Sequence, residues 1–201
     1  ERTSTPAPAP AASIAAEIAL PPAERDALLA SLEQAVRRQP DDPALASRYR
    51  AQCVRLAEHE RSVRFFERLA GEIADSRNVR LQLAAAYIDQ IPTCGGVAAV
   101  VCKGSLARGS LDQLDHLLRD DPEWWPALYC RAMNHLHWPR ALRHSAASAE
   151  DFEHCVAIQE AAGEPAAQPH FVRSYIGLGD ARAKDGDFDG ALAALKAGLA
   201  V

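Results

Sequence analysis

Residues 175–199, with the sequence YIGLGDARAKDGDFDGALAALKAGL, decide the fold of this chain. Apolar or small residues recur there at helical spacing and predict two amphipathic helices: Leu178, Ala191, Leu195 and Leu199. Between the helices, Gly186 can adopt the left-handed conformation that ends the first, and Asp187 can cap the second. Gly179 and Ala191 are small where the two backbones must approach closely. The stretch is therefore one helix-turn-helix unit.

Such a unit cannot bury its apolar face alone, so it must stack on similar units. A second copy occupies residues 46–69, and two looser copies begin at Leu81 and Leu128. Ala46 and Leu81 are separated by about one usual repeat of 34 residues, whereas the next two intervals are roughly a dozen residues longer. The two middle units therefore carry insertions.

The signature residues of the last unit resemble those of the tetratricopeptide repeat (TPR), a family of binding scaffolds: Tyr175, Leu178, Gly179, Gly186, Phe188, Ala191 and Leu195. The resemblance implies an all-α fold, an α-solenoid of stacked antiparallel helix pairs with insertions in the two middle repeats. We expect a cap helix and four repeats, at residues 23–39 and near residues 43–74, 77–121, 125–163 and 170–201.

The composition fits an array of paired helices. Ala, Leu, Arg and Glu dominate and favour helix, and no run of alternating apolar residues suggests a sheet. The formal net charge of -5 is spread in mixed sign along the chain, so we expect no nucleic-acid partner. No window approaches the roughly 18 apolar residues that cross a bilayer, so the chain is not expected to span a membrane.

Residues 1–22 form a Pro/Ala-rich tether, predicted to be largely disordered, ahead of the TPR-like helical domain at residues 23–201. Alternating Pro and Ala at residues 5–10 favour an extended, polyproline-like chain. The sequence opens on Glu1 instead of Met, as it would after removal of a leader or at a trimmed boundary. We expect an exported, periplasmic bacterial protein, with a cytoplasmic location as the alternative.

Five cysteines divide into two groups. Cys53, Cys130 and Cys155 fall on helical faces, where a free cysteine behaves as a small apolar group, so we expect them to pack in the core. Cys94 and Cys102 bracket the first insertion. A bond between them would close a small loop in an oxidising compartment, and two reduced cysteines are the alternative.

The two insertions lie at equivalent junctions of neighbouring repeats. The first, residues 93–104, holds an apolar Val-Ala-Ala-Val-Val core between glycines. We expect it to pack on the neighbouring helices; the alternative is an apolar lip presented to a partner. The second covers residues 137–145. Because stacked repeats align equivalent junctions, the insertions should be neighbours on one edge and form a wall beside the groove.

Four histidines crowd the second insertion without predicting a metal site. His135 and His137 are two positions apart on a predicted helix and point to different sides, and no CxxC or HExxH motif accompanies them, His144 or His154. We expect His135 to pack in its repeat and His137 to reach the groove. No nucleophile elbow, phosphate loop or dinucleotide motif is present. The expectation is therefore no metal, no cofactor and no enzymatic activity.

Trp124 and Trp125 stand at a helix entrance that Pro122 and Pro126 fix. We expect the two indoles to pack on the preceding repeat, and stacking on a ligand is the alternative.

In the TPR family the first helix of each pair lines a concave groove that holds an extended or helical peptide. By resemblance, the groove positions of this sequence are Ser47, Arg55, Gln82, Asp89, Gln90, Tyr129, Met133, His137, Arg173, Asp180 and Lys184. The Lys, Arg and Asn set with which chaperone-binding members clamp a carboxy-terminal Asp is not reproduced. Recognition of a chaperone tail is therefore not expected.

The sequence thus predicts a non-enzymatic adaptor that binds a partner protein or peptide in the groove. One alternative is a permanently bound accessory subunit of an exported enzyme or redox complex. Another is a small-molecule or metal-binding protein that uses the histidine and tryptophan cluster. Self-association is also possible, because Leu195 and Leu199 leave an apolar face on the last repeat.

Overall fold

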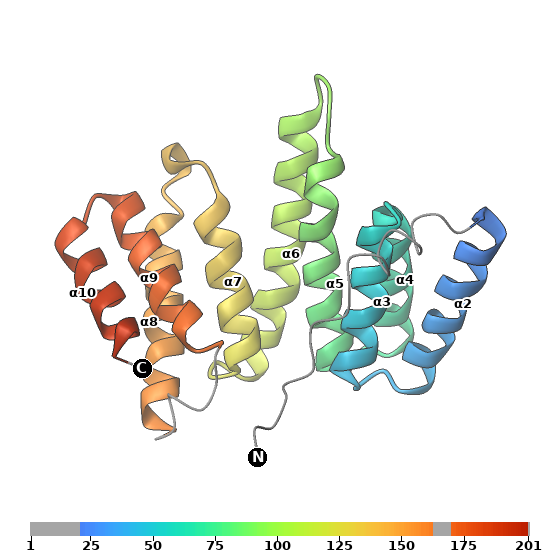
Figure 1. Ribbon diagram of the computed structural model, residues 1–201, viewed down its shortest axis with the longest axis horizontal. Coiled ribbons are helices and arrows are strands. Elements are labelled where there is room, and N and C mark those ends of the chain that lie inside the picture. Colours follow the sequence, from blue (N-terminus) through green and yellow to red (C-terminus); the bar gives the residue numbers. More distant parts are fainter. Residues whose placement is uncertain (1–20, 163–169, 201) are drawn as a thin grey trace, which may run out of the picture.

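The computed structural model describes residues 21–162 and 170–200, which form helices and no strand (Figure 1). The helices are α2 (Pro22–Arg38), α3 (Pro43–Arg55), α4 (His59–Glu72), α5 (Arg77–Gln90), η1 (Ile91–Thr93), α6 (Ala99–Asp120), α7 (Trp125–His137), η2 (Arg140–Leu142), α8 (Ser145–Ala161), α9 (Val172–Asp185) and α10 (Phe188–Leu199). The predicted tether falls almost wholly on residues 1–20, outside the described residues.

The helices form successive antiparallel pairs, α3 with α4, α5 with α6, α7 with α8, and α9 with α10, and α2 packs on α3. This is the predicted all-α solenoid, which is confirmed. The first helices of successive pairs (α3, α5, α7, α9) contact one another more than the second helices do. Neighbours approach most closely on the inside of a curve, so the first helices line the concave face.

The helix ends follow local chemistry that is visible in the sequence. Asp42 caps α3 by accepting from the backbone N–H of Ala44 at 2.8 Å. Gly186 takes a φ of 99° and ends α9, and Asp187 accepts from Gly190 N at 2.9 Å at the start of α10. Both roles of this last turn were predicted from the sequence and are confirmed.

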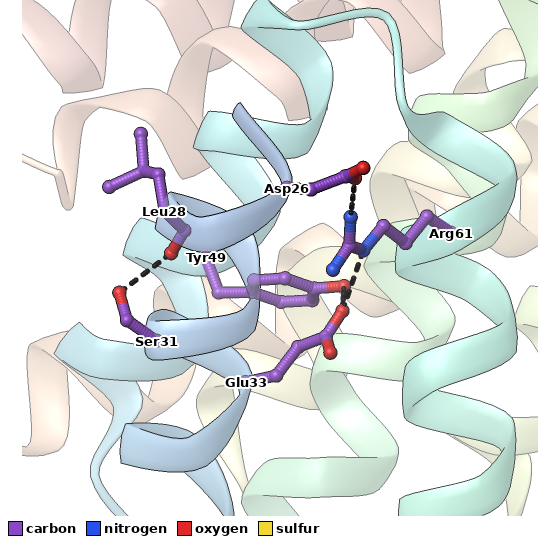
Figure 2. Close-up of polar contacts among 6 residues, drawn as sticks. All are labelled: Asp26, Leu28, Ser31, Glu33, Tyr49 and Arg61. Carbon is purple, nitrogen blue, oxygen red and sulfur yellow. Dashed lines mark hydrogen bonds and ion pairs between the residues drawn. The ribbon is translucent and has the colours of Figure 1, made fainter. Parts of the chain in front are cut away.

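A partly buried polar contact fixes α2 to the first repeat (Figure 2). The hydroxyl of Tyr49 on α3 donates to Glu33 Oε1 at 2.9 Å. Arg61 on α4 donates to the same oxygen at 2.8 Å and pairs with Asp26 on α2, also at 2.8 Å. One carboxylate of α2 therefore joins both helices of the first repeat, while Leu29 contributes to the apolar core beneath it.

The last repeat depends on close backbone approach. A Cβ added to Gly179 would lie 2.8 Å from Leu195 Cγ and 3.4 Å from the backbone oxygen of Ala191. The predicted close contact between α9 and α10 is therefore confirmed. A Cβ at Gly177 would overlap the ring of Phe152 on α8, so Gly177 gives this ring its place between α8 and α9.

The first insertion does not pack as expected. Its second half is the start of α6, and the side chains of Val97, Val100 and Val101 are exposed. The expectation that they cover neighbouring helices is wrong, because the tip of the α5–α6 pair projects beyond the adjacent repeats and nothing lies beside it at that height (Figure 1). The second insertion occupies the same edge, between α7 and α8.

Candidate partner-binding site

Four polar residues on the concave face bond to one another across the joint between α3 and α5. Arg50 Nη1 lies 2.5 Å from Asp89 Oδ2, and Arg50 Nε donates to Gln82 Oε1 at 3.2 Å. Gln82 Nε2 in turn donates to Ser47 Oγ at 3.2 Å. Gln82 is buried and the other three are half-buried. Their polar groups therefore hold two repeats together and are not free for a ligand.

Tyr129 lies toward the other end of the concave face, on α7. Its ring stacks on Trp125 with 5.0 Å between the ring centroids, and meets Phe152 edge-on at 5.8 Å. The other three tyrosines each donate a hydrogen bond to a glutamate. The Tyr129 hydroxyl makes no hydrogen bond within residues 21–162 and 170–200. Burial raises the pKa of Tyr129, so the hydroxyl stays neutral and can both donate and accept.

Arg173 and Asp180 lie on the neighbouring helix α9. They are seven residues apart, which is two helical turns, so they share one face. Both are exposed, and neither forms an ion pair with any residue that the structure describes. Burial raises the pKa of Tyr129, and the positive charge of Arg173 lowers it. The Arg173 guanidinium therefore lies near enough to act on the Tyr129 hydroxyl. We call Trp125, Tyr129, Arg173 and Asp180 the α7–α9 face.

Two of the predicted groove residues bond to the end of α7 instead of facing a ligand. Lys184 Nζ donates to Leu136 O and, at 2.6 Å, to Trp138 O. It therefore satisfies carbonyl groups at the carboxyl end of α7. His137 is exposed, but its Nδ1 lies 2.7 Å from Met133 O on its own helix. Met133 itself is half-buried and packs in the core cluster around Phe152.

The remaining predicted residues are Gln90 and Arg55. Gln90 is half-buried at the end of α5, and Arg55 is exposed on α3 with its Nη1 3.3 Å from Gln52 Oε1. Of the eleven predicted positions, six bond to other groups of the protein, Met133 packs in the core, and Gln90 is half-buried at the end of α5. The other three, Tyr129, Arg173 and Asp180, form the open set.

Arg50 was not among the predicted groove residues, although a signal for it exists. In the repeat template it occupies the position that Gly179 holds in the last repeat, where small residues allow close approach. An arginine at that position cannot be buried between helices and must reach the next repeat, as Arg50 does. His170 was not predicted either, and no pattern in the sequence indicates its role. Its ring centroid lies 5.2 Å from that of Trp125.

The two tryptophans of the helix entrance make different contacts. The guanidinium of Arg77 lies 4.1 Å from the ring centroid of Trp124, so this indole packs on the preceding repeat as expected. Trp125 instead donates to Gln159 Oε1 at 2.9 Å and contacts Phe171, at the entrance to the last repeat. Trp125 also packs against the apolar cluster that includes Ala84 and Leu114 of the preceding repeat, so its ring lies between that cluster and the entrance to α9.

His135 and His144 form a pair at the second insertion. Their Nδ1 atoms are 2.7 Å apart, and Trp138 stacks on His144 with 4.5 Å between centroids. Burial lowers the pKa of both rings; the neighbouring His144 lowers that of His135 further, and Lys184 lowers that of His144 further. Within the described part of the chain, no three His, Cys, Asp or Glu side chains are grouped to hold a metal ion.

The cysteines form one disulfide and three separate thiols. Cys94 and Cys102 are joined, with 5.8 Å between their Cα atoms. Cys53 and Cys155 are buried and Cys130 is half-buried. Burial raises the pKa of Cys53 and Cys130 to about 11 and that of Cys155 to about 12. These thiols are protonated at neutral pH and are poor nucleophiles.

The stacked helix pairs and their concave row of first helices define a TPR-like fold. No protein-family model matches the sequence, and no curated protein matches it. Among solved structures, the chain is similar to TTC0263, a thermophilic TPR protein in Thermus thermophilus. The two share 16% identity with a TM-score of 0.61, over 87% of this chain and 81% of that one.

The chain is also similar to the protein MamA. Here the identity is 14% and the TM-score 0.57, over 88% of each chain. At these identities the likeness is one of fold.

Proposed function

We propose that the protein is a non-enzymatic adaptor that binds a segment of a partner protein on the α7–α9 face. The observation that carries this proposal is the contrast in hydrogen bonding along the concave face. Arg173, Asp180 and the Tyr129 hydroxyl have no bonded partners within the described chain, whereas the polar groups at the α3–α5 joint are bonded to one another.

The residue types of the α7–α9 face suit an anchor for a peptide. Tyrosine, tryptophan and arginine are enriched among the residues that dominate binding energy at protein interfaces. Trp125 and Phe152 hold the Tyr129 ring in place, so little side-chain freedom is lost on binding. Arg173 and Asp180, two turns apart, would set the register of a segment with complementary charges.

The state of the thiols supports a role without nucleophilic catalysis, because the three free cysteines have raised pKa values. We also propose an exported, periplasmic location, with the cytoplasm as the alternative. The Cys94–Cys102 bond supports export, since disulfides persist in oxidising compartments.

A permanently bound accessory subunit is the second candidate. The exposed apolar residues of the last repeat favour it, because Leu199 is 88% and Leu192 52% exposed on α10. Size-exclusion chromatography of native extracts distinguishes the two. An adaptor elutes partly as a free chain, whereas an obligate subunit elutes only in its complex.

The binding proposal is tested by capture from native cell extracts with quantification by mass spectrometry. Tyr129→Ala and Arg173→Ala should each remove most of the partner captured by the unmodified protein. Tyr129→Phe isolates the hydroxyl and should weaken capture less. Lys196→Ala is the matched control, because Lys196 is an exposed cation on α10, outside this face. An unchanged captured set in all four variants contradicts the proposal.

A further inference from the structure

Two segments project from one edge of the solenoid. They are the tip of the α5–α6 pair, residues 94–104, and the α7–α8 junction, residues 138–144. Figure 1 shows both rising above the turns that flank them, between α3 and α4 and between α9 and α10. We call these two segments the projecting edge. A flat surface that approaches the molecule from this side meets the projecting edge before the flanking turns.

The projecting edge carries exposed apolar side chains at both of its points. Val97 is fully exposed, Val100 is 82% and Val101 76% exposed at the first, and Leu142 is 54% exposed at the second. Residues of this kind gathered on a projecting surface are typical of an interaction site.

Acidic residues are missing from both projecting segments and from the stretches of chain that adjoin them. No Asp or Glu lies between Asp89 and Asp112, where Lys103 and Arg108 are found, and none lies at residues 124–149. Arg140 and Arg143 belong to the second segment. Lys103, Arg140 and Arg143 form no ion pair with a described residue.

The flanking turns contain carboxylates, and the chain as a whole is acidic. Glu58 and Glu60 lie at the α3–α4 turn, and Asp185, Asp187 and Asp189 lie at the α9–α10 turn. The formal net charge of the chain is -5. The two projecting segments themselves contain three cations and no carboxylate.

Both segments are held in place by the rest of the molecule. The Cys94–Cys102 disulfide closes the first. In the second, Trp138 stacks on His144 and its carbonyl accepts from Lys184, while Ser145 Oγ donates to Asp185 Oδ1 at 2.9 Å. Little conformational freedom is lost when such preformed points bind.

We propose that the projecting edge binds the surface of an anionic lipid bilayer. Val97, Val100, Val101 and Leu142 would enter the boundary between headgroups and acyl chains, and Lys103 and Arg143 would face the anionic headgroups. Apolar residues at the leading points favour a bilayer over a nucleic-acid backbone. The attachment is peripheral, because no helix in the described part of the chain is long and apolar enough to cross a membrane.

The docking geometry also leaves the α7–α9 face open. The projecting edge lies where first helices end and second helices begin, whereas the α7–α9 face runs along the first helices. A protein bound to a bilayer in this way could hold its partner at the same time. Substitutions on the projecting edge should therefore leave partner binding unchanged, and substitutions on the α7–α9 face should leave bilayer binding unchanged.

The test is flotation of the full chain with vesicles. Vesicles of equal parts phosphatidylcholine and phosphatidylglycerol should carry the protein to the top of the gradient, and vesicles of phosphatidylcholine alone should not. Replacing Lys103 or Arg143 by Gln should weaken binding by about fivefold for each cation removed. High salt should release the protein, because headgroup attraction is screened.

Apolar insertion is tested by Val101→Asp and Leu142→Asp, each of which should reduce flotation as strongly as the loss of a cation. The matched controls are Leu192→Asp and Lys196→Gln on α10. Leu192 is 52% exposed, close to the value for Leu142, and lies away from the projecting edge. Circular dichroism of each variant verifies that the helical fold is kept.

Three outcomes overturn the proposal: no flotation with anionic vesicles, equal flotation with neutral vesicles, or equal losses in the edge variants and the α10 controls. Loss of a captured protein in the Val101→Asp variant, without vesicle binding by the unmodified chain, would assign the edge to a protein partner instead.

Discussion

At the α3–α5 joint the polar groups of the concave face bond to one another, whereas on the α7–α9 face a tyrosine hydroxyl, an arginine and an aspartate remain unbonded. The two regions also hold their repeats together by different means. Arg50 links Gln82 and Asp89 across the first joint, while Phe152 fills the space left by Gly177 in the last. The polar contacts of the last joint, such as Tyr175 with Glu160 and Arg182 with Glu153, lie between α8 and α9, so polar side chains on the concave face are left for a ligand.

The largest expected effect comes from Gly177→Val, which fills the space that the Phe152 ring needs to pack against α9. The new side chain would overlap the Phe152 ring and should lower the free energy of unfolding by about 3 kcal/mol. Gly71→Ala is the control, since a Cβ there meets no atom within 4 Å. It should change stability by less than about 1 kcal/mol. Urea denaturation measures both, and equal midpoints would show that the last joint does not depend on shape.

Arg50→Ala tests the polar joint. It leaves the half-buried Asp89 without its ion pair and Gln82 without a donor, and should cost about 2 kcal/mol. Arg173→Ala on the open face should cost less than about 0.5 kcal/mol, because exposed side chains without partners contribute little. Thermal and urea unfolding of the two variants compare the regions directly. A larger loss for Arg173→Ala would reverse the assignment of joint and open face.

A smaller effect on stability is expected from a change of pH, and it should be confined to the α7–α8 region around His135 and His144. The pKa values of His135 and His144 are lowered in the fold, so the unfolded chain binds protons more readily. The free energy of unfolding should therefore keep its full value above pH 6.5. It should fall as the pH drops from 6.5 through the lower pKa values of the folded state. The charged groups that act on the pair are Asp151, Asp115, Arg131 and Lys184.

Hydrogen exchange at pH 7 and pH 5, corrected for the chemical rate, measures this difference by region. The ends of α7 and α8 should lose protection while α3 and α4 keep it. His144→Gln removes one ring of the pair and should flatten the pH dependence. An equal loss of protection in α3 would place the sensitivity elsewhere.

Most of the fold could be predicted from the sequence because its signals are local. The α9–α10 unit was predicted from its spacing, its glycine turn and its Asp187 cap, and each of these acts within a few residues. The site was predicted less well. Ser47 and Gln82 were assigned to the groove, yet they bond to each other across 35 residues of chain. No local pattern could show that Lys184 would reach back to the end of α7.

The sequence by itself determined that this chain forms amphipathic helix pairs and that they must stack, because helical periodicity, caps and breaks act within single turns. Only the tertiary structure decided which concave side chains remain free, and that Val97, Val100 and Val101 project instead of packing. Those outcomes depend on which residues the stack brings together and on how far α6 extends beyond its neighbours. Both depend on contacts between repeats, which no single stretch of the sequence contains.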